Sequence, residues 1–81
     1  MASKAATARR DGLVKRSVTI QGHRTSFSLE PPFWAALREA AAEDGKALNA
    51  LVAEIDEARG TNLSSAIRVW LFERARAARD G

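Results

Sequence analysis

The 81-residue sequence predicts a mostly α-helical fold with a short β-ribbon, completed by two identical chains. An alternating apolar segment runs into a proline-started helix, a glycine ends that helix, and a second amphipathic helix begins at once. A chain this short buries only about 60% of the surface that it exposes when unfolded. The sequence has no cysteine, so no disulfide or zinc thiolate can add stability. We therefore expect a homodimer, because a unit this small cannot bury its own apolar face.

The ribbon is predicted within residues 16–29, where Val, Ile, Thr and Phe alternate with polar residues. Two arrangements are open for its first half. Gly22 and His23 can form a two-residue loop, which places Val18 opposite Phe27, or residues 16–22 can be an extended arm beside a strand at 24–29. In both, Phe27 and Leu29 point inward. The outer face then carries polar residues: Ser17, Thr19, Gln21, Arg24, Ser26 and Ser28.

The first helix is expected over residues 31–44, because proline is tolerated at the first helical position and Gly45 can end the helix in a left-handed conformation. Its predicted buried stripe follows helical spacing, and Trp34 lies beside this stripe. The stripe consists of Phe33, Leu37, Ala40 and Ala41.

Two further helices are expected, over residues 48–59 and 63–78, and Thr61 or Asn62 caps the second of them. The helix at 48–59 combines an apolar stripe with acidic residues on its outer surface. The last helix is apolar nearly all round, so we expect one face to pack on its own subunit and Val69 and Phe72 to face the partner chain. The own-subunit face consists of Leu63, Ile67, Trp70 and Leu71.

The charge is uneven along the chain. Residues 1–25 carry six Lys or Arg against one acid, a net +5, and residues 26–81 carry seven against nine, a net −2. Residues 1–15 show no apolar periodicity and are interpreted as a disordered basic arm before a domain at 16–78 and a tail at 79–81. A basic arm suits a polyanion, so Lys15 and Arg16 are expected to contact phosphates. No apolar run could span a membrane, and a cytoplasmic location is expected.

The order strand, proline, helix, glycine, helix resembles the ribbon-helix-helix family of DNA-binding proteins. Phe27-Ser28-Leu29 resembles the family's ribbon, and Gly45-Lys46-Ala47-Leu48-Asn49 resembles its tight turn between the two helices. The nearest likeness is to a group of small bacterial proteins with segments similar to RSVTIQGHRTSFSLEPPFW and TNLSSAIRVW. Together these segments extend the resemblance over about residues 16–72.

The resemblance implies a dimer whose paired strands enter the major groove of double-stranded DNA. Arg24, Ser26 and Ser28 would read base edges. The start of the second helix would hold a phosphate through the backbone at Lys46 and Ala47, helped by Asn49. The implied dimer core consists of Phe27, Leu29, Leu51, Val52, Ile55 and Trp70.

The chain departs from the family pattern in three ways. Ala47 stands where a capping Ser or Thr is usual, Glu30 follows the reading face, and Ser is a permissive reader of bases. The expected function is a DNA-binding transcriptional regulator without cofactor or metal. The alternative is an antitoxin-like adaptor that binds a protein partner, through the ribbon or the third helix.

The remaining polar and aromatic candidates are expected to be structural. His23 is interpreted as a turn residue, and Trp34 and Trp70 as core or dimer-interface residues. Ser64 and Ser65 follow a helix cap and have no base nearby in the sequence, so no acid, base and nucleophile come together. We therefore do not expect an enzyme.

Overall fold

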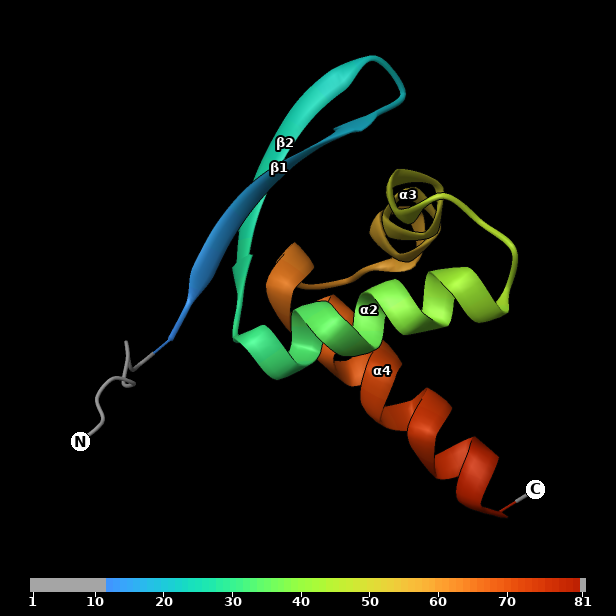
Figure 1. Cartoon of the computed structure of the whole chain (residues 1–81). Coiled ribbons are helices and arrows are strands. Elements are labelled where there is room, and N and C mark those ends of the chain that lie inside the picture. Colours follow the sequence, from blue (N-terminus) through green and yellow to red (C-terminus); the bar gives the residue numbers. More distant parts are fainter. Residues whose placement is uncertain (1–11, 81) are drawn as a thin grey trace.

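The computed structural model describes residues 12–80. A hairpin of two antiparallel strands extends away from a body of three helices (Figure 1). Strand β2 leads directly into α2, and α4 crosses beneath α2 in that view, on the far side from the hairpin tip. The elements are β1 (Val14–Ile20), β2 (His23–Leu29), α2 (Pro31–Glu43), α3 (Leu48–Ala58) and α4 (Leu63–Asp80).

The hairpin loop consists of Gln21 and Gly22, one residue earlier than the predicted loop. Both residues have positive φ, 51° and 82°, which is the type I′ geometry that suits the twist of a hairpin. Val18 therefore pairs with Thr25, and Arg16 pairs with Phe27. The prediction of Val18 opposite Phe27 was wrong, but the two faces of the ribbon are as expected because the pairing moved by two residues.

Strand β1 begins at Val14, so residues 14 and 15 belong to the sheet and not to the predicted basic arm. Val14 and Lys15 pair with Leu29 and Ser28, so β1 starts two residues earlier than predicted and every residue of β2 has a partner on β1. The rest of the predicted arm, residues 1–11, lies outside the described part of the chain.

The strand that pairs with β2 is therefore β1 of the same chain, where the sequence interpretation expected a twin molecule to complete the sheet. Phe27 is 6% exposed and Leu29 is 0% exposed in the single chain. Within the single chain, β1 and the Trp34 ring of α2 cover the inner side of the ribbon. The core cluster joins both strands and all three helices: Ile20, Phe27, Leu29, Trp34, Leu37, Ala40, Ala41, Leu51, Val52, Ile55, Leu63, Ile67 and Leu71.

Helix α2 begins at Pro31, and the Glu30 carbonyl accepts hydrogen bonds from the N–H groups of Phe33 and Trp34 at 2.9 and 3.1 Å. Trp34 is buried and Phe33 is only half-buried, so the predicted stripe is wrong at its first position. Trp34 is buried because it contacts the hairpin, and the helical spacing of apolar residues does not show that contact. The Trp34 ring stacks on Phe27 at 4.9 Å, and its Nε1–H donates to the Val14 carbonyl at 2.8 Å.

The helix boundaries follow the predicted signals closely. Gly45 has φ +68°, and the N–H groups of Gly45 and Lys46 bond to the carbonyls of Ala42 and Ala41, which is the Schellman arrangement at a helix end. Asn62, rather than Thr61, caps α4, because its Oδ1 accepts from the Ser65 N–H at 2.9 Å. Helix α4 extends to Asp80, two residues past the predicted end.

Candidate nucleic-acid interface

One face of the hairpin carries only polar and basic side chains. Cross-strand pairs share a face, so Lys15 lies with Ser28, Ser17 with Ser26, and Thr19 with Arg24. These six residues define the outer face of the hairpin. It contains all three predicted base readers, and it adds Ser17 and Thr19 from β1. The alternation of the sequence already placed these two residues outward, but the predicted base readers came from β2 alone.

Within this outer face, two of the serine hydroxyl groups are hydrogen-bonded to each other, whereas the two cationic side chains have no such partner within residues 12–80. The hydroxyl groups of Ser17 and Ser26 are hydrogen-bonded to each other at 2.9 Å, so the Ser26 hydroxyl must break or share this bond to contact a base. Lys15 and Arg24 are exposed. Within residues 12–80, neither makes an ion pair or a side-chain hydrogen bond. These two side chains are therefore the positive charges of the outer face that can contact an anionic partner.

Arg16 does not lie on the outer face. It pairs with Phe27 on the inner side of the ribbon, and its guanidinium lies over the Trp34 ring at 5.7 Å from the ring centre. This cation–π contact directs the side chain along the edge of the core. The structure thus separates Arg16 from Lys15, although the sequence interpretation grouped them.

The start of α3 lies beside the edge of β1. The Asn49 side-chain amide donates to the Thr19 carbonyl at 3.3 Å, which ties the first turn of α3 to the hairpin. Ala47 is the N-cap and makes no side-chain capping bond. A helix start presents backbone N–H groups and the positive end of the helix dipole, which suits an anion.

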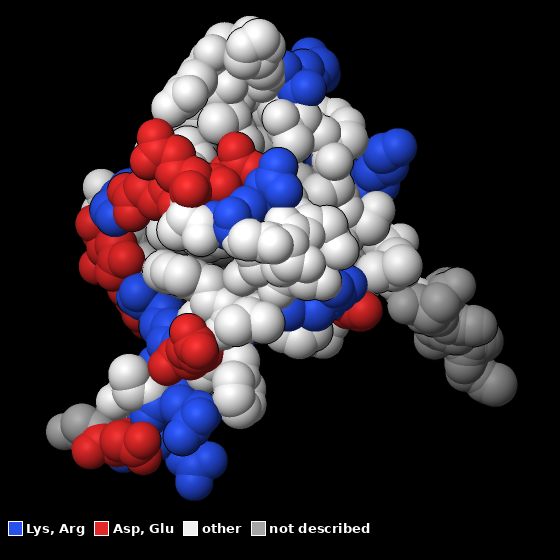
Figure 2. Space-filling model, turned by 180° about the vertical axis from the view of Figure 1, so that it is seen from behind, with Lys and Arg blue, Asp and Glu red and all other residues white. Residues whose placement is uncertain are grey.

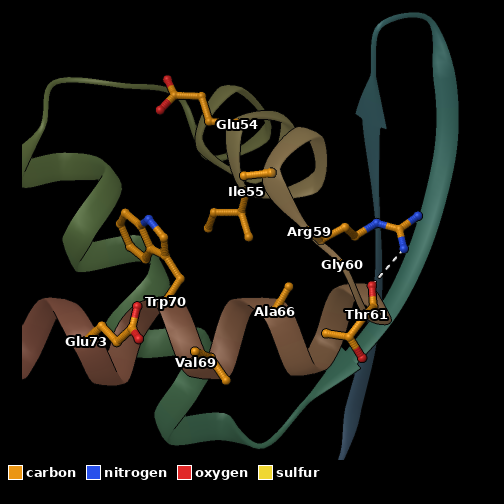
Figure 3. Close-up of a pocket in the computed structure, with 10 residues that line it drawn as sticks. Glu54, Ile55, Arg59, Gly60, Thr61, Ala66, Val69, Trp70 and Glu73 are labelled. Atoms are coloured by element: carbon orange, nitrogen blue, oxygen red, sulfur yellow. Dashed lines mark hydrogen bonds between the residues drawn. The ribbon is translucent and has the colours of Figure 1, made fainter.

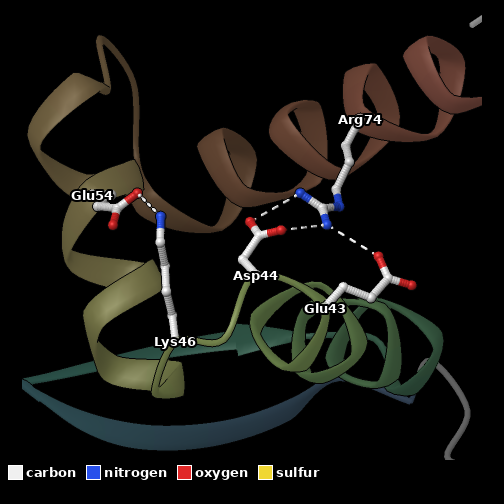
Figure 4. Close-up of polar contacts among 5 residues, drawn as sticks. All are labelled: Glu43, Asp44, Lys46, Glu54 and Arg74. Atoms are coloured by element: carbon white, nitrogen blue, oxygen red, sulfur yellow. Dashed lines mark hydrogen bonds and ion pairs between the residues drawn. The ribbon is translucent and has the colours of Figure 1, made fainter.

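The predicted phosphate contact Lys46 is already paired. Its Nζ lies 2.7 Å from Oε1 of Glu54, which lies eight residues farther along the chain, within α3 (Figure 4). The side chains of Lys46 and Glu54 are 36% and 55% exposed, so this ion pair is solvated and weak. Lys46 therefore contributes no free positive charge to the site while Glu54 holds it.

The charges on the body are segregated from those of the hairpin. In Figure 2 the charged side chains along the hairpin are basic, and acidic side chains gather over α3. The sequence agrees, because residues 12–29 contain no Asp or Glu, whereas α3 carries Glu54, Asp56 and Glu57. An anionic partner is therefore attracted to the hairpin and repelled by the outer surface of α3.

Ion pairs fasten α4 to the two ends of α2. Arg68 bonds Glu30 at 2.9 Å, and Arg74 bonds Asp44 at 2.9 Å and Glu43 at 3.0 Å (Figure 4). The Arg68 hydrogen bonds lower the pKa of Glu30, and those of Arg74 lower the pKa of Asp44. Asp44 in turn raises the pKa of Arg74. Glu30, expected to oppose DNA at the end of the reading face, is instead neutralised by Arg68.

A hollow of about 390 Å³ lies between α3 and α4 (Figure 3). Ile55, Ala66 and Trp70 line its apolar part, and Glu73 lies at one end. At the other end, Arg59 donates to the Thr61 carbonyl at 2.8 Å. Over residues 12–80 there is no group of three His, Cys, Asp or Glu side chains placed to hold a metal ion. Nor does that part of the chain contain a helix long and apolar enough to cross a membrane.

A family model described as a ribbon-helix-helix domain matches residues 13–75. The chain belongs to the ribbon-helix-helix family. No curated protein and no solved structure matches it. Ribbon-helix-helix proteins are generally DNA-binding transcription regulators and typically bind DNA as dimers. The matched region begins just before β1 and ends within α4, so it includes both strands of the hairpin.

In this ribbon-helix-helix chain, the residues expected to form a dimer core are buried within one molecule. Leu51, Val52 and Ile55 are at most 4% exposed, and Trp70 is half-buried beneath the Arg74 guanidinium. One face of α4 was expected to pack on its own subunit, and Leu63, Ile67 and Leu71 of that face are buried there. Val69 and Phe72 are 53% and 60% exposed.

Two of the residues that the sequence analysis expected to be structural are Ser64 and His23. The Ser64 hydroxyl donates to the Ser28 carbonyl at 2.8 Å, which joins the start of α4 to the outer edge of β2. His23 is exposed and begins β2, one residue beyond the loop.

Proposed function

We propose that this chain is a DNA-binding transcriptional regulator that places the outer face of its hairpin in the major groove. The observation that carries the proposal is this outer face: within residues 12–80 neither Lys15 nor Arg24 has an ionic partner, hydroxyl groups lie between them, and residues 12–29 contain no Asp or Glu. Hydroxyl and guanidinium groups are among the groups that read base edges, and a bidentate contact from Arg or Lys to guanine is the commonest specific contact.

The width of the hairpin supports the same function. Neighbouring strands lie about 4.8 Å apart, and a major groove about 12 Å wide admits a two-stranded ribbon. The hairpin has these two strands within a single chain. We therefore assign base contacts to both strands, with Thr19 and Arg24 near the loop and Ser17, Ser26 and Ser28 farther from it. Lys15, at the end away from the loop, is the proposed phosphate contact of the ribbon.

The start of α3 is the proposed phosphate contact. The Asn49 bond to β1 holds this helix end next to the ribbon, so a ribbon in the groove brings the helix start toward the flanking backbone. The N–H groups after Ala47 then supply the contact, and the Lys46 charge adds to it only when Glu54 releases it.

The test is binding to duplex DNA selected from a pool with a randomised centre, followed by fluorescence anisotropy at several salt concentrations. We expect affinity to fall steeply as salt rises, because phosphate contacts release counterions. Arg24→Ala should reduce discrimination between selected and random duplexes by about 1–3 kcal/mol, and Lys15→Ala should weaken binding to all duplexes alike.

Arg38→Ala is the matched control, since Arg38 is also exposed but lies on α2. A wild-type chain that selects no sequence and binds no duplex at low salt would refute the proposal. Equal losses from Arg24→Ala and Arg38→Ala would refute the role of the hairpin.

The adaptor function remains the second candidate because α3 is acidic and α4 exposes Val69 and Phe72. A purified protein partner that binds the chain while duplex DNA does not compete for it would favour this candidate.

A further inference from the structure

The hollow of about 390 Å³ between α3 and α4 has the size of a small-molecule site, since such sites usually span about 300–1,000 Å³. One face of each helix lines it (Figure 3). On α4 the lining follows the i, i+3, i+4, i+7 spacing of a single helix face: Ala66, Val69, Trp70 and Glu73. On α3 the lining includes Glu54 and Ile55.

The charges around the hollow leave one carboxylate without an ionic partner. Lys46 holds Glu54 at 2.7 Å, and Arg59 holds Asp56 at 2.6 Å. Glu73, by contrast, makes no ion pair and no side-chain hydrogen bond to any other residue between 12 and 80. An apolar hollow with an uncompensated negative charge at its edge suits a cation with an apolar body.

We propose that this hollow binds a small organic cation with an aromatic body, and that the cation competes with Lys46 for Glu54. The carboxylates of Glu54 and Glu73 come from different helices, and in Figure 3 their side chains flank Trp70. Both side chains are exposed and can rotate toward a ligand. An ammonium group has three N–H donors, so it can bond to both carboxylates.

The apolar part of the hollow fits a flat ring system. A protein cavity of about 150 Å³ holds a benzene ring, and the hollow is more than twice as large. The Trp70 ring is fixed by Arg74, whose guanidinium lies 5.3 Å from the ring centre and is itself held by Asp44 and Glu43. Arg74 does not line the hollow, so a ligand ring can pack between Trp70 and Ile55.

Occupancy of the hollow is linked to the start of α3 through Glu54. The Lys46–Glu54 pair is solvated and weak, so a cation that also buries its ring can replace Lys46 on Glu54. Lys46 is then free beside the helix start. If the proposed DNA-binding function holds, on which this link rests, the ligand strengthens DNA binding, and DNA strengthens ligand binding by the same factor.

The first experiment titrates the full chain with tryptamine in the absence of DNA. The two tryptophans give two indole N–H resonances. We expect the Trp70 resonance to shift with a dissociation constant on the order of 1 mM. The buried Trp34 resonance should stay in place, since its Nε1–H is bonded to the Val14 carbonyl. Tryptophol, the neutral alcohol of the same shape, and indole-3-propionate, an anion, should bind more weakly.

Two variants test the carboxylate and the space separately. Glu73→Gln should raise the tryptamine dissociation constant about two- to fivefold, because one partly solvated ion pair is lost. Glu39→Gln is the matched control, since Glu39 is exposed on α2 outside the hollow. Ala66→Leu should weaken binding further by filling the space of the ring, and circular dichroism checks that it folds. Binding of tryptophol as tight as that of tryptamine, or no shift of Trp70, would overturn the proposal.

The second experiment measures the link by fluorescence anisotropy with a duplex, with and without tryptamine. Tryptamine should steepen the slope of log affinity against log salt by up to about 0.9 in wild type, and not in Glu54→Gln, where Lys46 is already free. Ala66→Leu controls for any effect of the amine on the duplex. An unchanged slope with tryptamine bound would overturn the link. A chain that binds tryptamine but no duplex supports the ligand site and refutes the proposed function, whereas a chain that binds duplexes but no tryptamine refutes only the ligand site.

Discussion

At the scale of single residues, Trp34 and Gly45 fix how the helices meet the hairpin. Trp34 joins α2 to both strands through its stacking on Phe27 and its hydrogen bond to the Val14 carbonyl. Gly45 ends α2 so that α3 can turn back toward β1. The presentation of the outer face therefore depends on residues that do not belong to it.

Gly45→Ala should destabilise the fold by about 1–2 kcal/mol, because an L-residue is strained at a left-handed φ. An added Cβ meets nothing within 4 Å, so backbone strain is the only expected cause. Gly60→Ala is the control, since Gly60 has equal space and no left-handed φ. Urea denaturation measures both, and equal midpoints for the two variants would contradict this explanation.

At the scale of elements, α3 combines a helix start suited to phosphate with an acidic outer surface. Glu54 holds Lys46 at 2.7 Å, so the helix restrains its own nearest cation. The outer face of the hairpin has no such internal partner for Lys15 or Arg24. An anion is therefore attracted mainly by the hairpin, and the acidic surface of α3 opposes this attraction.

Glu54→Gln should strengthen binding to all duplexes, because Lys46 is then free to contact a phosphate. If it makes one contact, the slope of log affinity against log salt should steepen by about 0.9. Glu57→Gln removes an acid from the same helix without releasing Lys46, and it controls for the general change in charge. Identical slopes for the two variants would show that Lys46 does not contact DNA.

At the scale of the whole molecule, the ion pairs of Arg68 and Arg74 join the last helix to both ends of α2. They hold α4 in the position where it covers the core with Ile67 and Leu71. The side chains of Glu30 and Asp44 are 38% and 30% exposed, so each of these ion pairs is partly solvated and contributes modestly, and only while the acid is ionised.

Stability should therefore decline in acid. The ordinary pKa values are 4.5 for Glu30 and 3.8 for Asp44, and the fold lowers both. The stabilisation is complete above these unfolded-state values and is lost as the pH falls through the lower folded-state values. Thermal melting should show a falling midpoint below about pH 4.5, with a shallower fall in Asp44→Asn. An unchanged pH profile in that variant would contradict the role of Asp44.

Local signals in the sequence determined the helices, their ends and the two faces of the ribbon. Pro31, Gly45 and Asn62 act within a turn or two of the chain, and the period of the apolar residues assigns each side chain to a face. The proposed readers Arg24, Ser26 and Ser28 could be selected in the same way, because alternation alone places them outward.

Only the tertiary structure decided which elements cover the ribbon and which charges are free. The partner of β2 is β1, Trp34 replaces Phe33 in the core, and Lys46 and Arg16 are held by Glu54 and Trp34. These contacts join residues from separate turns or elements, so their spacing in the sequence does not encode them. A short chain can bury its apolar face in its own added strand and helix or in a twin, and periodicity is the same in both cases.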